Sequence, residues 1–215
     1  MRLAAVIFDV DGTLADNLDH AARAYRKSFE HFTGRTWTSA ELFALFGPNC
    51  EGICRAAVPD RWPEAVEMFY RELDATYDDA AAAVPGMGEL LRALRERGCR
   101  LATVSGGSPR SLEITLRHTG LGGFFERVVG GSADRAHKAE SIREVLAGFG
   151  IAPADAAYVG DSSYDMRAAR EAGILPVRAA WSKSATLFVE RPGEPAPAYT
   201  FREAAEFIRW VEGWG

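Results

Sequence analysis

The sequence predicts an α/β fold in which a parallel sheet carries helices on both faces and a small helical cap is inserted after the first strand. Two observations predict this class. Short apolar segments that suit buried strands alternate with segments of helical periodicity, which is typical of parallel sheets whose strands are joined by helices. One almost entirely helical block, from residue 18 to about residue 77, interrupts the alternation directly after the first strand.

The alternating elements can be placed along the chain. The strands are expected at residues 3–8, 100–104, 127–130, 156–159, 175–177 and 198–200. The helices that connect and follow them are expected at residues 87–97, 109–119, 138–149, 165–172 and about 202–214. Gly98 and Gly173 follow two of these helices, where glycine commonly ends a helix. Strands joined in this way run parallel, so their carboxyl ends share one edge of the sheet.

The helical block defines the expected domain division. Residues 1–16 and 83–215 form a Rossmann-like core, and residues 17–82 form the cap. The block leaves the sheet at the carboxyl end of the first strand, which is where open α/β sheets bind their ligands. We therefore expect the cap to cover a site as a lid, hinged near residues 15–16 and 83–84.

The composition restricts the classes of protein to consider. The chain of 215 residues is 47% hydrophobic and 26% charged, which is typical of a globular protein with an ample core. The net charge of -5 argues against nucleic acid as a partner, because binding to a phosphate backbone requires concentrated Lys and Arg. The three cysteines form no CxxC pair, so neither a disulfide framework nor a zinc knuckle is indicated.

The same inspection predicts where the protein works. No apolar run approaches the roughly 20 residues of a membrane span, and the N-terminus lacks the composition of a signal peptide. We therefore expect a cytoplasmic protein without a membrane partner. Trp181, Trp210 and Trp214 could belong either to the core or to a subunit surface, so a monomer and a homodimer both fit.

Two acids, Asp9 and Asp11, follow the first strand and are separated by one residue. In a strand these two positions project to the same face, so their carboxylates meet at one point. Carboxylates that close repel each other unless a cation or a shared proton is present. The pair therefore indicates a divalent metal site, a carboxylate nucleophile, or both. The alternative is an acidic turn, since Asp and Gly are ordinary turn residues.

Three further polar clusters fall at the expected carboxyl ends of other strands. Ser105, Gly106 and Gly107 follow the second strand, and this hydroxyl with its glycines could present backbone N–H groups to an oxyanion. Lys138 follows the third strand, and Asp161 and Asp165 follow the fourth. Each cluster alone has an ordinary explanation: a loop, a solvated lysine, or a helix N-cap at Asp165. Their shared edge predicts that they converge.

The order of these motifs resembles the haloacid dehalogenase superfamily, and within it the phosphoglycolate phosphatase-like and β-phosphoglucomutase-like group with a helical cap. The resemblance rests on Asp9-Val10-Asp11-Gly12-Thr13, on Ser105, on Lys138 and on the segment 160–165, Gly-Asp-Ser-Ser-Tyr-Asp. It covers essentially the whole chain. Two departures concern the phosphate pocket: Gly106 stands where the group often has Asn, and Ala139 stands where it often has Pro.

The resemblance implies a role for each matching position. Asp9 is expected to attack phosphorus and form an aspartyl-phosphate, while Asp11 acts as general acid and base. A magnesium ion, Mg²⁺, is expected on Asp9, on the backbone carbonyl of Asp11 and on Asp161, with Asp165 either a direct ligand or a supporting residue. An acid at position 11 favours phosphate esters, because it can protonate an alkoxide leaving group.

The remaining implied roles concern the substrate. Ser105, Gly106 and Gly107 are expected to bind the phosphoryl oxygens, and Lys138 to offset their charge. The substrate is expected to be a small phosphorylated, phosphoglycolate-like metabolite, with Asn49 and Arg55 of the cap touching its leaving group. Two alternatives remain: a phosphosugar mutase with the same intermediate, and a non-catalytic binding protein that has kept the fold.

Overall fold

The computed structural model describes residues 2–77, 83–134, 137–183 and 196–214. Its centre is a six-stranded sheet in the order β3-β2-β1-β4-β5-β6, and every neighbouring pair is parallel. The strands are β1 (Ala5–Phe8), β2 (Arg100–Val104), β3 (Arg127–Val129), β4 (Ala156–Gly160), β5 (Leu175–Ala179) and β6 (Tyr199–Phe201). Since β1 lies between β2 and β4, its carboxyl end is flanked by the ends of both.

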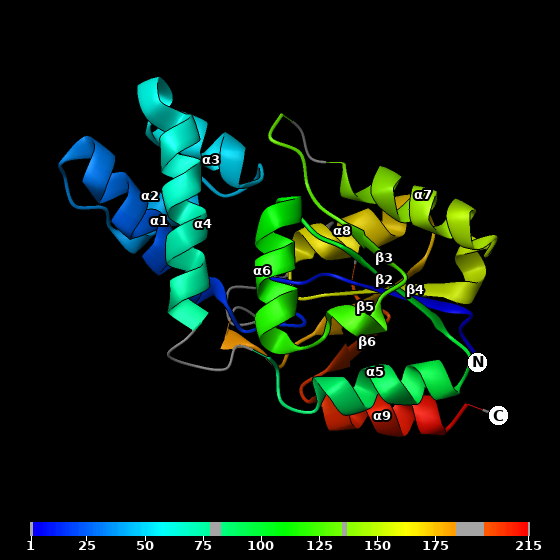
Figure 1. The fold of residues 1–215 in the computed structure, drawn as a ribbon. Coiled ribbons are helices and arrows are strands. Elements are labelled where there is room, and N and C mark those ends of the chain that lie inside the picture. The colour runs from blue at the N-terminus through cyan, green and yellow to red at the C-terminus, as the bar shows by residue number, and fades with distance from the viewer. Residues whose placement is uncertain (1, 78–82, 135–136, 184–195, 215) are drawn as a thin grey trace.

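Helices cover both faces of this sheet, as predicted (Figure 1). The helices of the core are α5 (Met87–Glu96), α6 (Pro109–Thr119), α7 (Lys138–Phe149), α8 (Ser163–Ala172) and α9 (Ala204–Glu212). Alternate residues of β1 supply the two apolar layers. Val6 and Phe8 pack in a cluster with residues of α5, α6 and α9. Ala5 and Ile7 pack in another with residues of α7 and α8.

The helical block after β1 forms four helices to one side of the sheet (Figure 1). These are α1 (Leu18–Thr33), α2 (Ser39–Ala44), α3 (Cys50–Ala57) and α4 (Trp62–Tyr77). Side-chain caps stabilise the N-termini of the two short helices, α2 and α3. Thr38 and Glu41 form a capping box at α2, and Asn49 caps α3. We call these helices and their connections the cap; they share a hydrophobic cluster that includes Phe29.

The chain leaves and re-enters the core at neighbouring points. Ala15 forms an isolated antiparallel bridge with Ala83, and the N–H of Val84 donates to the carbonyl of Leu14 over 3.1 Å. Residues 78–82 of the expected cap boundary lie outside the described residues. The division into a core and a cap of residues 17–82 therefore remains our proposal, with the hinge at this bridge.

The predicted element boundaries differ from the structure by a few residues. The sequence predicts a helix at residues 165–172, but α8 begins at Ser163. Ser162 is its N-cap and accepts from the N–H of Asp165, so the possible N-cap role of Asp165 is wrong. Asp165 instead sits at the third helical position and closes a capping box. Among the described residues, no helix combines the length and apolar character needed to cross a membrane.

Candidate active site

The loop after β1 presents the two acids of the first motif. The N–H of Asp9 donates to the carbonyl of Val159 over 2.8 Å, so the strand pairing extends to the residue that carries the carboxylate. Gly12 follows with φ of 77°, a conformation that glycine adopts without steric cost and that turns the chain sharply after Asp11. Asp9 and Asp11 both line the same cavity.

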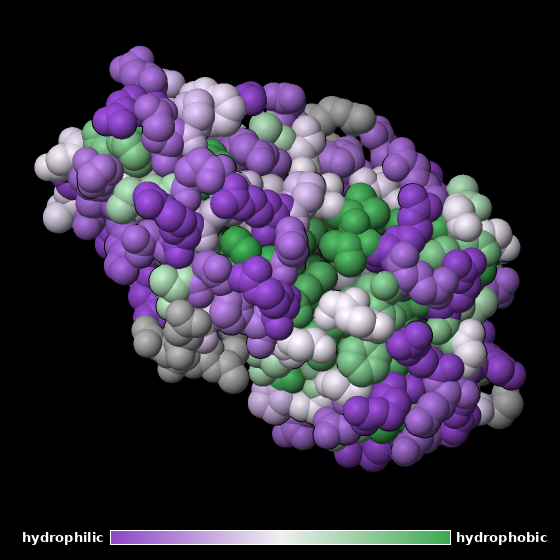
Figure 2. Space-filling model, viewed as in Figure 1, coloured by the Kyte–Doolittle hydropathy of each residue, from purple (hydrophilic) through white to green (hydrophobic). Residues whose placement is uncertain are grey.

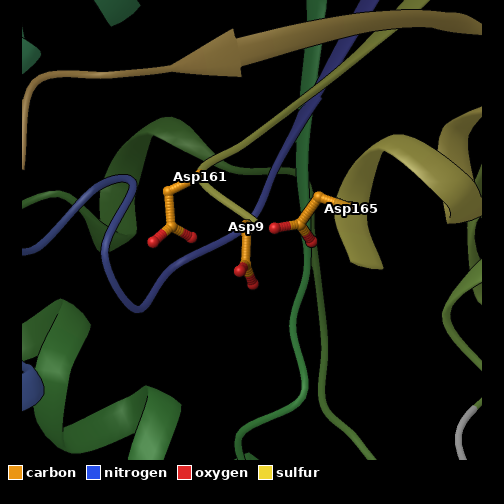
Figure 3. Close-up of side chains that lie close together, drawn as sticks. All are labelled: Asp9, Asp161 and Asp165. Atoms are coloured by element: carbon orange, nitrogen blue, oxygen red, sulfur yellow. The ribbon is translucent and has the colours of Figure 1, made fainter. Parts of the chain in front are cut away.

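Asp161 and Asp165, which follow β4, join Asp9 in an acidic cluster. One carboxylate oxygen from each of these three buried residues lies within 4.8 Å of the others. Figure 3 shows Asp165 directed toward Asp9, with Asp161 on the other side of Asp9. Gly160 makes this packing possible, because a Cβ at that position would collide with the Asp165 side chain. The two motifs, far apart in sequence, thus supply one site.

Lys138 brings a buried positive charge to this cluster. Its Nζ lies 2.6 Å from Oδ1 of Asp165 and 3.4 Å from Oδ1 of Asp9. Lys138 begins α7, and the partial positive charge of a helix N-terminus does not favour a cation there. Burial also lowers the pKa of a lysine, but the carboxylates of Asp165 and Asp9 outweigh it and raise the pKa of Lys138. The carboxylates therefore hold this lysine in its charged form.

The loop after β2 completes the core side of the cavity. The N–H of Ser105 donates to the carbonyl of Val129 over 3.0 Å, and Ser105 Oγ accepts from the N–H of Gly107 over 3.3 Å. Ser105, Gly106 and Gly107 all line the cavity together with Lys138. At Gly106, nothing would lie within 4 Å of an added Cβ. This loop leaves space for a ligand at Gly106, whereas the N–H of Gly107 is already used.

The cavity lies between this edge of the sheet and the cap, and its volume is about 380 Å³. Asn49 lines it from the N-terminus of α3, but Arg55 does not. The Arg55 guanidinium lies 3.0 Å from Asp134 and 4.7 Å from the centre of the Trp62 ring, with almost half of its side chain exposed. The structure therefore brings together the predicted core residues and Asn49, and places Arg55 outside the cavity.

With this geometry established, comparison with known proteins identifies the family. The sequence pattern of the family described as haloacid dehalogenase-like hydrolase matches residues 6–179, which is most of the chain. The chain belongs to this family. The predicted superfamily is thereby confirmed, and the match runs from β1 to the end of β5, including all motif residues.

The chain is similar to two curated proteins and one solved structure with different names. A pyrophosphatase PpaX of Bacillus velezensis is 25% identical over 183 residues, covering 84% of this chain and 85% of that protein. A phosphoglycolate phosphatase of Synechococcus elongatus is 30% identical over 181 residues, covering 83% and 84%. The crystal structure of CbbY from Rhodobacter sphaeroides in complex with phosphate has a TM-score of 0.80 at 22% identity, over 95% and 96%. That last likeness confirms the predicted fold.

The acidic cluster of this family member fits a divalent cation. All three side chains offer carboxylate oxygens, which are the ligands that Mg²⁺ prefers. Oδ1 of Asp9 is buried without a hydrogen-bond partner. Burial, together with the neighbouring carboxylates of Asp165, Asp161 and Asp11, raises the pKa of Asp9 to about 8 against the opposing effect of Lys138. A second positive charge at this point would keep Asp9 ionised at neutral pH.

Asp165 differs from the other two acids because donors already occupy both of its oxygens. Oδ1 accepts from Lys138, and Oδ2 accepts from the backbone N–H of Ser162 over 2.9 Å and from its hydroxyl over 2.5 Å. A metal needs lone pairs that are not already engaged in such bonds. These contacts favour a supporting role for Asp165, in which it fixes Lys138 and the start of α8.

Asn17 is a functional candidate that the sequence analysis missed. Its Nδ2 donates to Oδ1 of Asp11 over 2.5 Å and to the hydroxyl of Tyr77 over 3.1 Å. The Tyr77 hydroxyl in turn lies 2.9 Å from Oγ1 of Thr115 in α6. Burial raises the pKa of Asp11, and the Asn17 hydrogen bond opposes this rise. The only sequence signal for this role is that Asn17 lies six residues after Asp11, at the start of the predicted cap. Once both side chains are buried, each needs a hydrogen-bond partner.

Proposed function

We propose that this chain is a Mg²⁺-dependent phosphatase that hydrolyses a small phosphorylated metabolite through an aspartyl-phosphate on Asp9. That it is a phosphate-ester hydrolase follows from its family and from relatives named pyrophosphatase and phosphoglycolate phosphatase. The observation that carries the finer proposal is the convergence of Asp9 and Asp11 with Lys138 and the acidic cluster around one cavity.

In the first step the Asp9 carboxylate attacks phosphorus. A bond forms between an Asp9 oxygen and phosphorus, and the bond from phosphorus to the ester oxygen breaks. Asp11 donates its proton to the departing oxygen, which leaves as an alcohol. Its burial raises its pKa and so favours the protonated form that this step requires. Lys138 and the Ser105 loop would stabilise the negative charge on the phosphoryl oxygens.

In the second step water hydrolyses the aspartyl-phosphate. Asp11, now a carboxylate, takes a proton from the water, whose oxygen attacks phosphorus. Inorganic phosphate leaves, and Asp9 regains its carboxylate. The cap would keep bulk water away from the first step, because it closes the cavity opposite Asp9.

The proposed metal would be held by Asp9 and Asp161, with the Asp11 carbonyl as the further ligand implied by the resemblance. When bound, Mg²⁺ would supply charge that keeps Asp9 ionised and offsets the charge of the phosphoryl group. Asp165 would position Lys138 beside it, through the 2.6 Å contact described above.

The test is release of inorganic phosphate from 4-nitrophenyl phosphate and from a panel of phosphoglycolate, a nucleoside monophosphate, a hexose phosphate and pyrophosphate. We expect turnover that requires Mg²⁺, that is abolished by EDTA and that returns on adding Mg²⁺. The same preparation of Asp9→Asn is the control for contaminating phosphatases. Failure to release phosphate from any of these compounds with Mg²⁺ present would contradict the proposal and favour the non-catalytic alternative.

The mutase alternative receives no support from the cap. A phosphosugar mutase must hold a second phosphate away from Asp9, and cations normally do this. Among the described residues that line the cavity, Lys138 is the one cation, and it belongs to the core. We therefore propose the hydrolase rather than the mutase.

A further inference from the structure

The cap side of the cavity is more apolar than charged metabolites such as phosphoglycolate or pyrophosphate would require. The cap residues that line it are mostly apolar, and they include Leu18, Tyr25, Phe46, Ile53, Phe69 and Leu73. The rings of Tyr25 and Phe69 stack with their centres 4.1 Å apart, and Phe46 lies 5.9 Å from Tyr25. Together these six residues form what we call the apolar wall, opposite Asp9.

The polar side chains beside this wall are neutral, and their hydrogen-bond donors are already engaged. The Asn49 carbonyl accepts from the backbone N–H groups of Glu51 and Gly52, and its amide donates to the carbonyl of Gly131. The Asn17 amide is used by Asp11 and Tyr77, and Thr115 pairs with Tyr77. A second anionic group of a substrate would lose its hydration here without gaining a cation from any described residue of the cap.

The cationic side chains of the cap lie elsewhere. Lys27 pairs with Glu72 over 2.8 Å and Arg55 pairs with Asp134. Among the described residues of the cap, no lysine or arginine lines the cavity. The visible outer surface of the cap helices is mostly hydrophilic (Figure 2). The cap therefore directs its charges outward and its aromatic residues toward Asp9, which is the arrangement of a pocket for an uncharged, apolar group.

We propose that the natural substrate is the phosphate monoester of an uncharged, predominantly apolar alcohol, whose ring or hydrocarbon body packs on the apolar wall. This inference rests on the proposed phosphatase function and narrows its substrate. The phosphoryl group lies at the charged core side, and the alcohol leaves from the apolar side after Asp11 has protonated it. Phosphoglycolate, pyrophosphate and sugar bisphosphates, which carry a second anionic group, are then poor substrates.

Matched substrates test the inference in the wild-type protein. Benzyl phosphate and methyl phosphate both release an alcohol of low acidity, and they differ in the apolar group that could reach the wall. We expect kcat/KM for benzyl phosphate to exceed that for methyl phosphate by at least about tenfold, because burial of an aromatic ring stabilises the bound state. We also expect kcat/KM for benzyl phosphate to exceed that for phosphoglycolate and for pyrophosphate by at least about tenfold.

Two phenylalanines provide a matched pair of variants. Phe46 and Phe43 are exposed to similar extents, 37% and 39%, and their ring centres lie 5.3 Å apart, but only Phe46 lines the cavity. Phe46→Ala should lower the ratio of kcat/KM for benzyl over methyl phosphate by at least about fivefold. Phe43→Ala should leave that ratio unchanged.

A third variant, Ala21→Arg, puts a cation on the cavity side of α1. It should raise the ratio of kcat/KM for phosphoglycolate over benzyl phosphate at least about tenfold, because the guanidinium can bind the carboxylate of phosphoglycolate.

The outcomes separate this inference from the function on which it rests. If 4-nitrophenyl phosphate is hydrolysed but phosphoglycolate or pyrophosphate is preferred over benzyl phosphate, the phosphatase stands and the apolar substrate class is wrong. If benzyl phosphate is preferred but Phe46→Ala and Phe43→Ala behave alike, the apolar wall is not the source of the preference and the inference also falls. If the wild type releases no phosphate from any ester, both proposals fail.

Discussion

The two sides of the cavity are built on different principles. On the core side, Asp9 and Asp161 follow the neighbouring strands β1 and β4, whose backbone pairing fixes their positions, and Lys138 begins α7 beside Asp9. On the cap side, rings such as Tyr25 and Phe69 project from helices that pack on one another. In our proposals, the core side performs the chemistry on the phosphoryl group, whereas the cap side selects the group attached to it. In this proposal the charged, catalytic residues come from the core, and the apolar residues that select the substrate come from the cap.

The largest expected effect belongs to the core side. Asp9→Asn should lower kcat by at least about 10⁴-fold, because an amide is a very poor nucleophile. The fold should persist, since Asn has the same shape and relieves repulsion among the carboxylates of the acidic cluster. Phosphate release and a thermal melt of the same sample measure both quantities. Turnover near the wild-type rate would remove Asp9 from the mechanism.

A second prediction separates two acids within the core side. Asp161→Asn should raise the Mg²⁺ concentration for half-maximal activity at least about tenfold, while the stability of the metal-free protein stays within about 1 kcal/mol. Asp165→Asn should instead lower the free energy of unfolding by about 3 kcal/mol, because it removes the charge of the nearer of the two buried carboxylates that pair with Lys138. Mg²⁺ titrations and urea unfolding of both variants provide the comparison. Equal shifts in the two Mg²⁺ titrations would make Asp165 a direct ligand.

Asn17 lies where the two sides meet and allows a finer test. Asn17→Ala removes the donor that holds Asp11, so proton donation to the leaving group should suffer about 10- to 100-fold. Methyl phosphate needs that proton and should show the full loss in kcat/KM. The 4-nitrophenolate group leaves readily without a proton, so 4-nitrophenyl phosphate should show a much smaller loss. An equal loss on both esters would indicate damage to the site rather than loss of Asp11 positioning.

The sequence predicted the core side well because its geometry follows from topology. Once the strands are parallel and β1 is central, residues directly after β1, β2 and β4 must share an edge, whatever the detailed packing. Asp9, Ser105 and Asp161 therefore met as predicted, and the helices on both faces followed from the alternation. The ambiguous position was Asp165, where a capping box and an ion pair with Lys138 use the same carboxylate.

The cap side was less predictable for physical reasons. The helical periodicity of Tyr25, Phe69 and Leu73 indicates a buried face, but one apolar stripe can cover a core or line a cavity. Arg55 was expected at the substrate because α3 follows the loop at Asn49. Its direction depends on Asp134, which is 79 residues away in the chain and which no local pattern connects to it.

The smallest effect is expected at Arg55, and it tests the boundary between the two sides. Its ion pair with Asp134 is largely exposed, and exposed pairs contribute only about 0.2–1 kcal/mol. Arg55→Gln should therefore change kcat/KM by less than about fivefold for benzyl phosphate, methyl phosphate and phosphoglycolate alike, and leave their order unchanged. Steady-state kinetics on the three esters provide the measurement, with Asp134→Asn as the matched variant that breaks the same pair from the core side. A tenfold loss confined to phosphoglycolate in Arg55→Gln, but absent in Asp134→Asn, would mean that this guanidinium turns into the cavity and binds a carboxylate. The cap would then supply charge to the substrate, and the separation of charge from selection would not hold.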